Sequence, residues 1–177
     1  MIRVFFKYIV YIVLFSYMMI VFLPKTNVYY LGLDFLKPYK VFIVSENIKD
    51  NSLSLDIENL KVKYEGIEVA QIESLSVGTY LYRTTLEIDA IKANDVLKNF
   101  IPEYVQKISI THNVFKNPFK IDINARFKQG RAFGEVDLLE RKVMISLDVS
   151  RNFISKYRDI LKNLKKNGKY YTYEYQY

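Results

Sequence analysis

The segment Phe119–Val149 reads FKIDINARFKQGRAFGEVDLLERKVMISLDV, and it decides the fold. Apolar and polar residues alternate along it in three runs, which Gln129-Gly130 and Glu140-Arg141 separate. Alternation with a period of two is typical of strands with one buried face, and such short breaks join antiparallel neighbours. The segment therefore predicts a three-stranded antiparallel meander with one apolar face and one face that carries charges of both signs.

Upstream of the meander the alternation continues but slips in phase. The apolar positions of Leu53–Ile57 resume out of phase at Leu60, after Glu58-Asn59, and further slips occur within Ile67–Val77. A slip of one residue turns the apolar set to the wrong face unless a β-bulge or a bend restores it. The repeated slips predict a strongly curved sheet.

Downstream of the meander the apolar spacing becomes helical. Ser150 is a residue type that begins helices, and one apolar stripe follows it, made of Phe153, Ile154, Tyr157, Ile160, Leu161 and Leu164. Gly168 is expected to end this helix as its C-cap, and the tail Tyr170–Tyr177 is expected to form a final strand. The predicted fold is an N-terminal transmembrane helix plus an α+β domain dominated by a curved antiparallel β-sheet with a late amphipathic helix.

The N-terminal segment predicts the membrane helix. Tyr8–Leu23 reads YIVYIVLFSYMMIVFL without a charge, and the span extends to Val4 if Lys7 reaches the interface with its ammonium group. A cleaved signal peptide is the alternative, but it needs a pair of small residues at the cleavage site. Val21–Asn27 offers no such pair, which favours an uncleaved signal anchor.

The flanking charges predict the orientation of the anchor. Arg3 and Lys7 lie on a short N-terminal tail, and such tails remain in the cytoplasm. Residues 1–24 are therefore expected to form the cytoplasmic tip and signal anchor, and residues 25–177 a single exported domain. In a bacterium this arrangement is single-pass in the cytoplasmic (inner) membrane, with the C-terminal domain in the periplasm.

Two shorter segments also show helical character. Val28–Leu36 follows the cap types Thr26 and Asn27 and is expected to be a short helix near the membrane surface. Asn94–Ile101 is expected to make one or two helical turns, with Asn94 as the cap.

The composition restricts the class of protein. Half of the 177 residues are hydrophobic and a quarter are charged, which is typical of neither a disordered chain nor a polytopic membrane protein. The absence of cysteine excludes thiol chemistry and thiolate metal sites. The net charge of +7 favours anionic neighbours, although a Lys- and Asn-rich composition is also typical of AT-rich genomes.

No pattern in the sequence indicates catalysis. His112 is the only histidine and is expected in a surface turn, so a histidine metal site is not expected. The six glycines are scattered, and no serine has the surroundings of a nucleophile elbow. Carboxylates alternate along the strand exteriors, and a catalytic pair among them stays open. We expect no catalytic residues, no metal and no cofactor.

One basic segment is the candidate site. It runs along the predicted late helix and just past Gly168, and it contains Lys156, Arg158, Lys162, Lys165, Lys166 and Lys169. One interpretation is a solvated helix face that its C-terminal dipole favours. The other is an anion-facing patch for lipid headgroups, an acidic partner or nucleic acid. Direct contact of the domain with nucleic acid is not expected, and the tyrosines of the tail are expected to belong to an edge strand.

The layout resembles the GspN component of type II secretion systems and is similar to the broader AsmA-like group of exported, membrane-anchored β proteins. The resemblance spans most of the chain. The segments that carry it are Leu23-Pro24, the run Leu53–Val62, the glycine-marked Gly130–Leu138, Val143–Val149, and the tail that begins at Gly168. The resemblance implies a non-enzymatic protein whose curved sheet presents an apolar concave face to lipid or protein partners.

Two functions follow as expectations. The first is a non-enzymatic component of an envelope machine of the type II secretion, type IV pilus or DNA-uptake kind, which docks its partners through the β domain. The second is an AsmA-like lipid-binding or lipid-handling module. An open apolar groove favours the second function, and a closed core with exposed strand edges favours the first.

Overall fold

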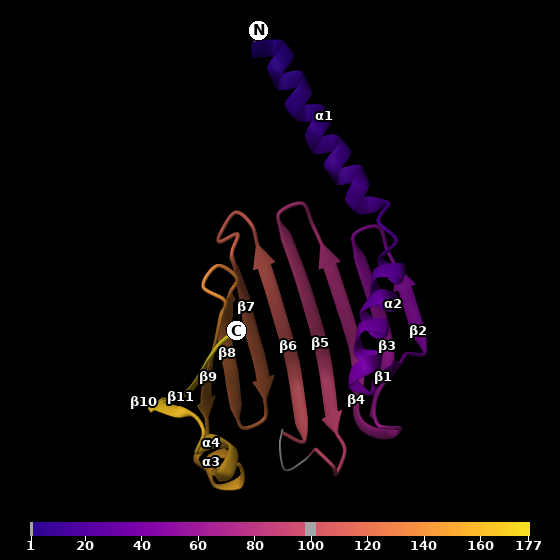
Figure 1. Ribbon diagram of the computed structural model, residues 1–177. Coiled ribbons are helices and arrows are strands. Elements are labelled where there is room, and N and C mark those ends of the chain that lie inside the picture. The colour runs from indigo at the N-terminus through magenta and orange to yellow at the C-terminus, as the bar shows by residue number, and fades with distance from the viewer. Residues whose placement is uncertain (1, 98–101) are drawn as a thin grey trace.

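A long N-terminal helix leads into a curved sheet in the computed structural model, which describes residues 2–97 and 102–177 (Figure 1). Helix α1 is Ile2–Val21. Its length of about 30 Å follows from 1.5 Å per residue and matches the hydrocarbon core of a bilayer. The segment Val4–Val21 is long and apolar enough to cross a membrane, and none of it is buried against the rest of the chain.

The predicted strands form as one antiparallel sheet. The strands in the described residues, in chain order, are β1 (Val41–Val44), β2 (Asn47–Asp50), β3 (Ser54–Tyr64), β4 (Ile67–Thr79), β5 (Arg83–Ala93), β6 (Tyr104–Asn113), β7 (Lys120–Phe127), β8 (Gly130–Asp137), β9 (Lys142–Val149), β10 (Lys165–Asn167) and β11 (Tyr170–Gln176). Their order across the sheet is β1-β3-β4-β5-β6-β7-β8-β9-β11-β10, and β2 pairs with β3 beside β1. The expected meander is strands β7 to β9, and the tyrosine-rich tail is the final strand β11, so both predictions are confirmed. The tail is not the edge strand that was expected, because β10 pairs with Tyr170–Thr172 on its outer side.

The strand register places the apolar residues in rows on one face. One row runs across the sheet through Ile57, Leu75, Ile88, Ile108, Ala125, Ala132 and Leu147. The next row runs through Leu60, Ile72, Ile91, Val105 and Phe127. On strands β3 to β6 the two rows are three residues apart. In a regular strand, two residues lie on the same face only if they are an even number of positions apart.

A crease between these two rows explains how both rows share a face. Asn59 of β3 and Ala90 of β5 have left-handed backbones, with φ of 55° and 53°, and Gln106 of β6 is an extra residue opposite β7. Glu58 and Leu60 nevertheless keep one register with β4. The slip predicted at Glu58-Asn59 is therefore a bend without a bulge. The left-handed backbone of Asn59 is strained, and the apolar packing offsets the energetic cost of this strain.

A second slip is a true β-bulge. Strand β3 pairs Val62 with Ala70 and Lys63 with Glu68, so that Val69 of β4 is the extra residue. Bulges increase the local twist and bend the bulged strand. The crease and this bulge together account for the curvature that the phase slips predict.

Gly134 allows β8 and β9 to approach closely on the apolar face. A Cβ placed on Gly134 would overlap the carbonyl oxygen of Met144 and lie 2.9 Å from the Cα of Ile145. Glycine is therefore required here by space, since no other residue lacks a Cβ. Gly130, four residues earlier on the same face, meets β9 in the same way at Val149.

The opposite face carries charges of both signs, as predicted. Lys107 donates to Glu87 at 2.7 Å, and Lys120 donates to Glu135 at 2.6 Å, each across a strand pair. These hydrogen bonds raise the pKa of both lysines. Both pairs are partly exposed to solvent, so they define the polar face and stabilise it only modestly.

The late helical segment differs from its prediction. It forms two short helices, α3 (Arg151–Lys156) and α4 (Arg158–Leu161), which break at Tyr157. Ser150 caps α3 as expected, since its hydroxyl accepts from the Phe153 N–H at 3.4 Å. Gly168 is not a helix cap. With φ of 58° it turns the hairpin from β10 to β11, which requires the left-handed conformation that glycine favours.

The early helix begins sooner than predicted. Helix α2 is Lys25–Leu36 and is followed by the 3-10 turn η1 (Lys37–Tyr39). Thr26 lies inside α2 and does not cap it. The helical turns expected for Asn94–Ile101 lie partly outside the described residues, and within them Leu97 donates to the Asn94 carbonyl in a single turn.

Candidate functional site

The apolar face of the sheet is covered by helices at its two ends. At one end, Leu55, Ile57 and Leu60 are buried in a cluster to which Tyr29 of α2 adds its ring. At the other end, α3 and α4 bury Phe153, Tyr157 and Leu161 against strands β6 and β7, where Val105 and Phe127 lie. The two clusters are separate, so the two helical covers do not meet.

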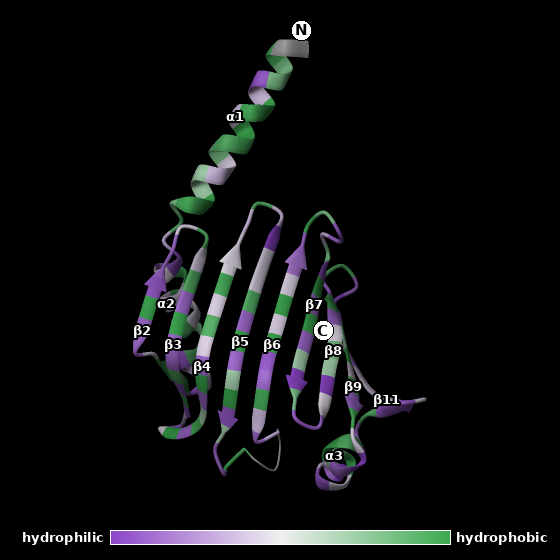
Figure 2. Ribbon diagram, turned by 180° about the vertical axis from the view of Figure 1, so that it is seen from behind, coloured by the Kyte–Doolittle hydropathy of each residue, from purple (hydrophilic) through white to green (hydrophobic). Residues whose placement is uncertain are grey.

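Among the described residues, no helix covers the middle of the face. The central side chains of strands β5 to β9 are half-buried, and none of the following is fully buried: Leu86, Ile88, Ile110, Ile123 and Ile145. Ile88 belongs to the first apolar row, and the other four form a third row with Val77 and Gly134. Figure 2 shows the apolar positions as green bands that alternate with polar positions along the strands. We name this face the groove, because the sheet curves around it.

The curvature follows from the contacts of the C-terminal helices. One apolar cluster joins Phe153, Tyr157 and Leu161 of the C-terminal helices to residues on strands β5, β6, β7, β8 and β9, including Ile91 of β5 and Leu147 of β9. A single cluster includes residues of five neighbouring strands only if the sheet curves around it, because adjacent strands lie about 4.8 Å apart. The apolar face is therefore the concave one.

An apolar cavity of about 320 Å³ lies where the groove meets these helices. Its lining is formed by Ile91, Pro102, Val105, Ile108, Ala125, Phe127, Ala132, Leu147, Phe153, Tyr157, Ile160 and Leu161. Binding sites for small molecules have volumes of about 300–1,000 Å³ and mostly apolar walls. The cavity fits this class, and its residue types suit a hydrocarbon chain.

A polar cavity of about 700 Å³ adjoins the apolar one and shares Pro102, Phe127 and Tyr157 with it. The polar cavity is lined by three lysines (Lys92, Lys128 and Lys156) and two carboxylates (Asp95 and Glu103). An apolar chamber beside a cationic one is suited to an amphipathic molecule with an anionic head.

The predicted basic patch is not one surface. Lys156 lines the polar cavity, whereas Lys165 and Lys166 lie on the exposed edge strand β10. Lys162 pairs with Asp159 at 2.7 Å, Lys169 pairs with Asp148 at 3.2 Å, and Arg158 begins α4. These hydrogen-bonded lysines lower the pKa of both aspartates. Of the six residues, Lys156 alone lines the polar cavity, and Lys92 and Lys128, which sequence reasoning missed, accompany it there.

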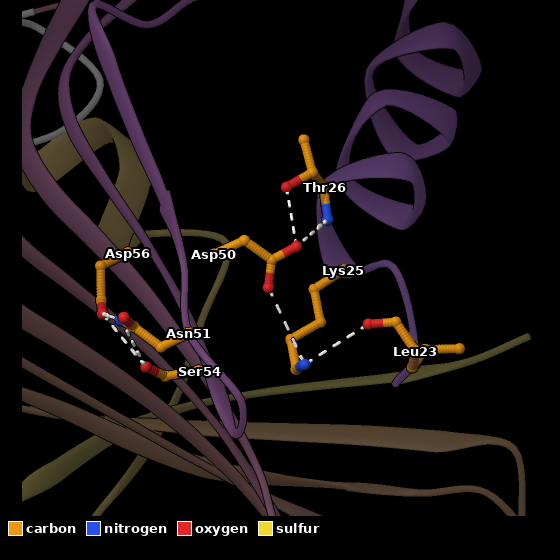
Figure 3. A network of polar contacts seen from close by, with 7 residues as sticks. All are labelled: Leu23, Lys25, Thr26, Asp50, Asn51, Ser54 and Asp56. Carbon is orange, nitrogen blue, oxygen red and sulfur yellow. Dashed lines mark hydrogen bonds and ion pairs between the residues drawn. The ribbon is translucent and has the colours of Figure 1, made fainter. Parts of the chain in front are cut away.

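The joint between α1 and the sheet is a second built feature (Figure 3). Asp50, at the end of β2, accepts from the backbone N–H of Thr26 at 3.2 Å and from its hydroxyl at 2.9 Å. Its other oxygen lies 3.9 Å from the Lys25 ammonium, which also donates to the Leu23 carbonyl at 3.4 Å. Asp50 therefore replaces the missing cap of α2.

Lys25 is 6% exposed, and it is the most buried charged residue among those described. Burial of an ammonium group is costly unless it is paired, and Asp50 supplies the pairing carboxylate. The joint thus fixes the chain just after α1 to the edge of the sheet. No local sequence pattern marks Asp50 as a partner of a residue 24 positions away.

We expect Asp50→Ala to open this joint. Loss of the charged acceptor should make opening easier by about 1.5 kcal/mol or more. Trypsin should then cleave after Lys25 about tenfold faster in the full-length protein held in lipid nanodiscs. Asp34→Ala is the matched control, because that carboxylate forms an exposed pair with Lys37. Equal cleavage rates in the two variants would contradict this role of Asp50.

His112 lies in strand β6 rather than in a turn, which corrects the prediction. Its Nε2 donates to the Pro118 carbonyl at 2.9 Å. Within residues 2–97 and 102–177, no group of three or more histidine or carboxylate side chains is arranged to hold a metal ion.

No protein-family model, curated protein or solved structure matches this chain.

Proposed function

We propose that this protein is a membrane-anchored, non-enzymatic module that binds the acyl chains of lipids in its groove. The observation that carries the proposal is the apolar cavity of about 320 Å³ at the end of an uncovered apolar face. Soluble domains rarely leave such a face without a partner. A lipid tail suits it, because a flexible hydrocarbon chain needs area and no hydrogen bonds.

The adjoining lysines support an anionic lipid. Lys92, Lys128 and Lys156 line the polar cavity that shares Phe127 with the apolar one. Ammonium groups bind phosphate and carboxylate groups as point charges. A phospholipid or a fatty acid with its tail in the apolar cavity would place its head group near these lysines.

The anchor supports a source for this ligand. Helix α1 is long enough to span a bilayer, and the joint at Asp50 ties it to the sheet. In the proposed arrangement the short N-terminal tail with Lys7 stays in the cytoplasm, and the domain lies on the periplasmic side of a bacterial inner membrane. The groove would then take lipid from the membrane that holds the anchor.

Photolabelling tests the proposal. The full-length protein is placed in nanodiscs whose phospholipid carries a diazirine on its acyl chain, and labelled peptides are mapped by mass spectrometry. Label on α1 serves as the internal standard, since that helix contacts lipid in every variant. We expect strong label on peptides that line the apolar cavity, including the one with Ile108.

Two neighbouring substitutions make the test specific. Ile108 lines the cavity, whereas Ser109 lies on the opposite face of the same strand. Ile108→Asn should lower cavity label relative to α1 label about tenfold, because a polar amide there costs about 1–3 kcal/mol. Ser109→Asn should leave it unchanged. Ala132→Leu fills the cavity with an apolar group and buries no polar group. Loss of cavity label in this variant as well would show that the loss comes from the cavity and not from unfolding.

A second candidate function is the docking component of an envelope machine, of the type II secretion, type IV pilus or DNA-uptake kind. The observation that favours it is an apolar stripe on α2, in which Val28, Leu31 and Phe35 are 52%, 67% and 71% exposed. A partner helix could pack on such a stripe. The edge formed by β10 favours docking less, because β10 is short and carries two lysines, which protect edges from pairing.

Affinity purification separates the two functions. The tagged full-length protein is extracted gently from its native membrane, and both proteins and lipids are identified. Docking would be favoured if secretion or pilus platform proteins were recovered in stoichiometric amounts and if this recovery were lost when Leu31 and Phe35 are replaced. Recovery of the protein with enriched phospholipid, lost in Ile108→Asn, would favour lipid binding.

A further inference from the structure

Three hairpin tips of the sheet display large apolar side chains to solvent. Phe115, on the tip between β6 and β7, is 84% exposed, and Leu139, between β8 and β9, is 72% exposed. The tip between β4 and β5 adds Leu81 and Tyr82. We name the following six exposed residues the apolar rim: Leu81, Tyr82, Val114, Phe115, Leu138 and Leu139.

The apolar rim lies at the end of the sheet where α1 joins it. Because neighbouring strands are antiparallel, alternate turns lie at the same end of the sheet, and Figures 1 and 2 show these three tips on the side toward α1. In Figure 1 the tips after β4 and β6 reach the level at which α1 ends. Two turns at the opposite end, Glu65-Gly66 and Lys128-Gln129, carry no apolar side chain.

Two of the tips are built in the same way. The side-chain oxygen of Asn113 accepts from the backbone N–H of Phe115 and of Lys116, both at 3.1 Å. Asp137 accepts from Leu139 at 3.0 Å and from Glu140 at 2.9 Å in the same manner. In each tip the most exposed apolar residue is the second after the acceptor, so the turn holds it outward.

The adjacent tips also contact each other. The rings of Tyr82 and Phe115 stack with centroids 5.7 Å apart. The turns and this stacking hold the side chains in place, yet all six rim residues remain exposed. They form a ready surface for an apolar phase at this end of the molecule.

We infer that the apolar rim inserts into the interfacial region of the bilayer that α1 spans, and gives the domain a second membrane contact. Tyrosine is suited to that region, because its ring is apolar and its hydroxyl meets water. Phenylalanine and leucine add apolar area that lipid can bury. Arg83, Lys116 and Arg141 lie on the same tips and would face anionic head groups.

The inference rests on the proposed anchoring by α1 and not on lipid binding in the groove. With the rim at the interface, the tip-side end of the groove would open at the membrane surface. Along strands β5 to β9, the row with Leu86, Ile110, Ile123 and Ile145 lies between this end and the row that lines the cavity.

Site-specific fluorescence tests the inference, and the chain helps because it contains no cysteine. Single cysteines at Val114 in the rim, at Gln129 in the opposite turn and at Ser16 in α1 are labelled with an environment-sensitive dye. The full-length protein is reconstituted in phosphatidylcholine vesicles, with and without phosphatidylglycerol. Lipids that carry a nitroxide at a shallow or deep position then quench the dye according to its depth.

The three probes give distinct results. We expect the emission of the Val114 probe to shift to the blue and to be quenched mostly by shallow nitroxides. The Ser16 probe should be quenched by deep nitroxides. The Gln129 probe should be quenched by neither. Phe115→Asp combined with Leu139→Asp should abolish quenching at Val114 and leave it at Ser16. These tips are exposed, so the double variant should keep its circular dichroism spectrum and unfolding midpoint.

Two outcomes would overturn the inference in different ways. Equal, weak quenching at Val114 and Gln129 with normal quenching at Ser16 would leave the anchor intact and refute the rim contact. Absence of quenching at Ser16 would refute the anchoring itself and the rim contact with it. Neither outcome depends on photolabelling of the groove, so failure of lipid binding there would be recognised separately.

Discussion

The variant Gly134→Ala should lower the free energy of unfolding by about 3 kcal/mol or more. The added Cβ would overlap the Met144 carbonyl oxygen, which belongs to the backbone of β9 and cannot rotate away. The strands would have to separate, and their separation would break the β8–β9 hydrogen bonds on which the curl of the sheet depends. A typical domain is stable by only about 5–15 kcal/mol, so this is a large part of the total.

Urea unfolding of the full-length protein in detergent micelles, followed by circular dichroism, measures the effect. Gly32→Ala is the matched control, because nothing lies within 4 Å of a Cβ at Gly32 in helix α2. That variant should raise the free energy of unfolding by up to about 1 kcal/mol, since alanine favours helix more than glycine does. If the two variants had equal stability, close approach of β8 and β9 would not be the reason for a glycine at position 134.

The variant Phe153→Ala should lower the free energy of unfolding by about 3–5 kcal/mol. Phe153 is 6% exposed, and its ring lies 5.2 Å from that of Phe127 and 4.5 Å from that of Tyr157. It is therefore the link between the C-terminal helices and the sheet. Truncation removes apolar contact on both sides and leaves a void that joins the adjacent cavity.

Phe35→Ala provides the comparison for Phe153→Ala, because Phe35 is 71% exposed. Its removal should change the free energy of unfolding by no more than about 0.5 kcal/mol. The same urea titrations report both values, and hydrogen exchange should show that Phe153→Ala releases the amides of α3 and α4 first. Equal effects at the two positions would mean that the C-terminal helices contribute little to the fold.

The sequence predicted the sheet well because its signal is local. Alternation along Phe119–Val149 identifies three strands, and the short turns leave only one way to pair them. The phase slips also indicated curvature. Their alignment in one crease, however, depends on the register between β3 and β6, which brings Asn59 and Ala90 to the same level of the sheet.

The helical segment after Ser150 was harder to predict for a physical reason. Its apolar spacing is helical through Leu164, but packing on a concave sheet breaks the helix at Tyr157 and turns Lys165–Asn167 into an edge strand. Gly168 suits a helix cap and a hairpin turn equally, since both need positive φ. Tertiary contacts decided between these two structures.

The candidate site depends on contacts across the sequence that no short pattern reveals. The lining of the apolar cavity extends from Ile91 to Leu161. Its polar neighbour adds Lys92 from β5 and Lys128 from the turn after β7, and β6 lies between these two strands. No short pattern reveals the joint at Asp50 either, because a single aspartate at the end of a strand is common and does not identify its partners. The resemblance to AsmA-like proteins suggested an apolar concave face, but it named none of these residues.

The order of the strands has a consequence for how the chain acquires its structure. From β3 to β9 every strand pairs with the next one in sequence, so the sheet can assemble hairpin by hairpin as the polypeptide emerges. The segment that carries α3, α4 and β11 comes last. Until it arrives, the apolar residues beside Phe127 stay uncovered. In the proposed membrane-anchored arrangement, the nascent chain would meet surrounding lipid or chaperones before its own C-terminal helices.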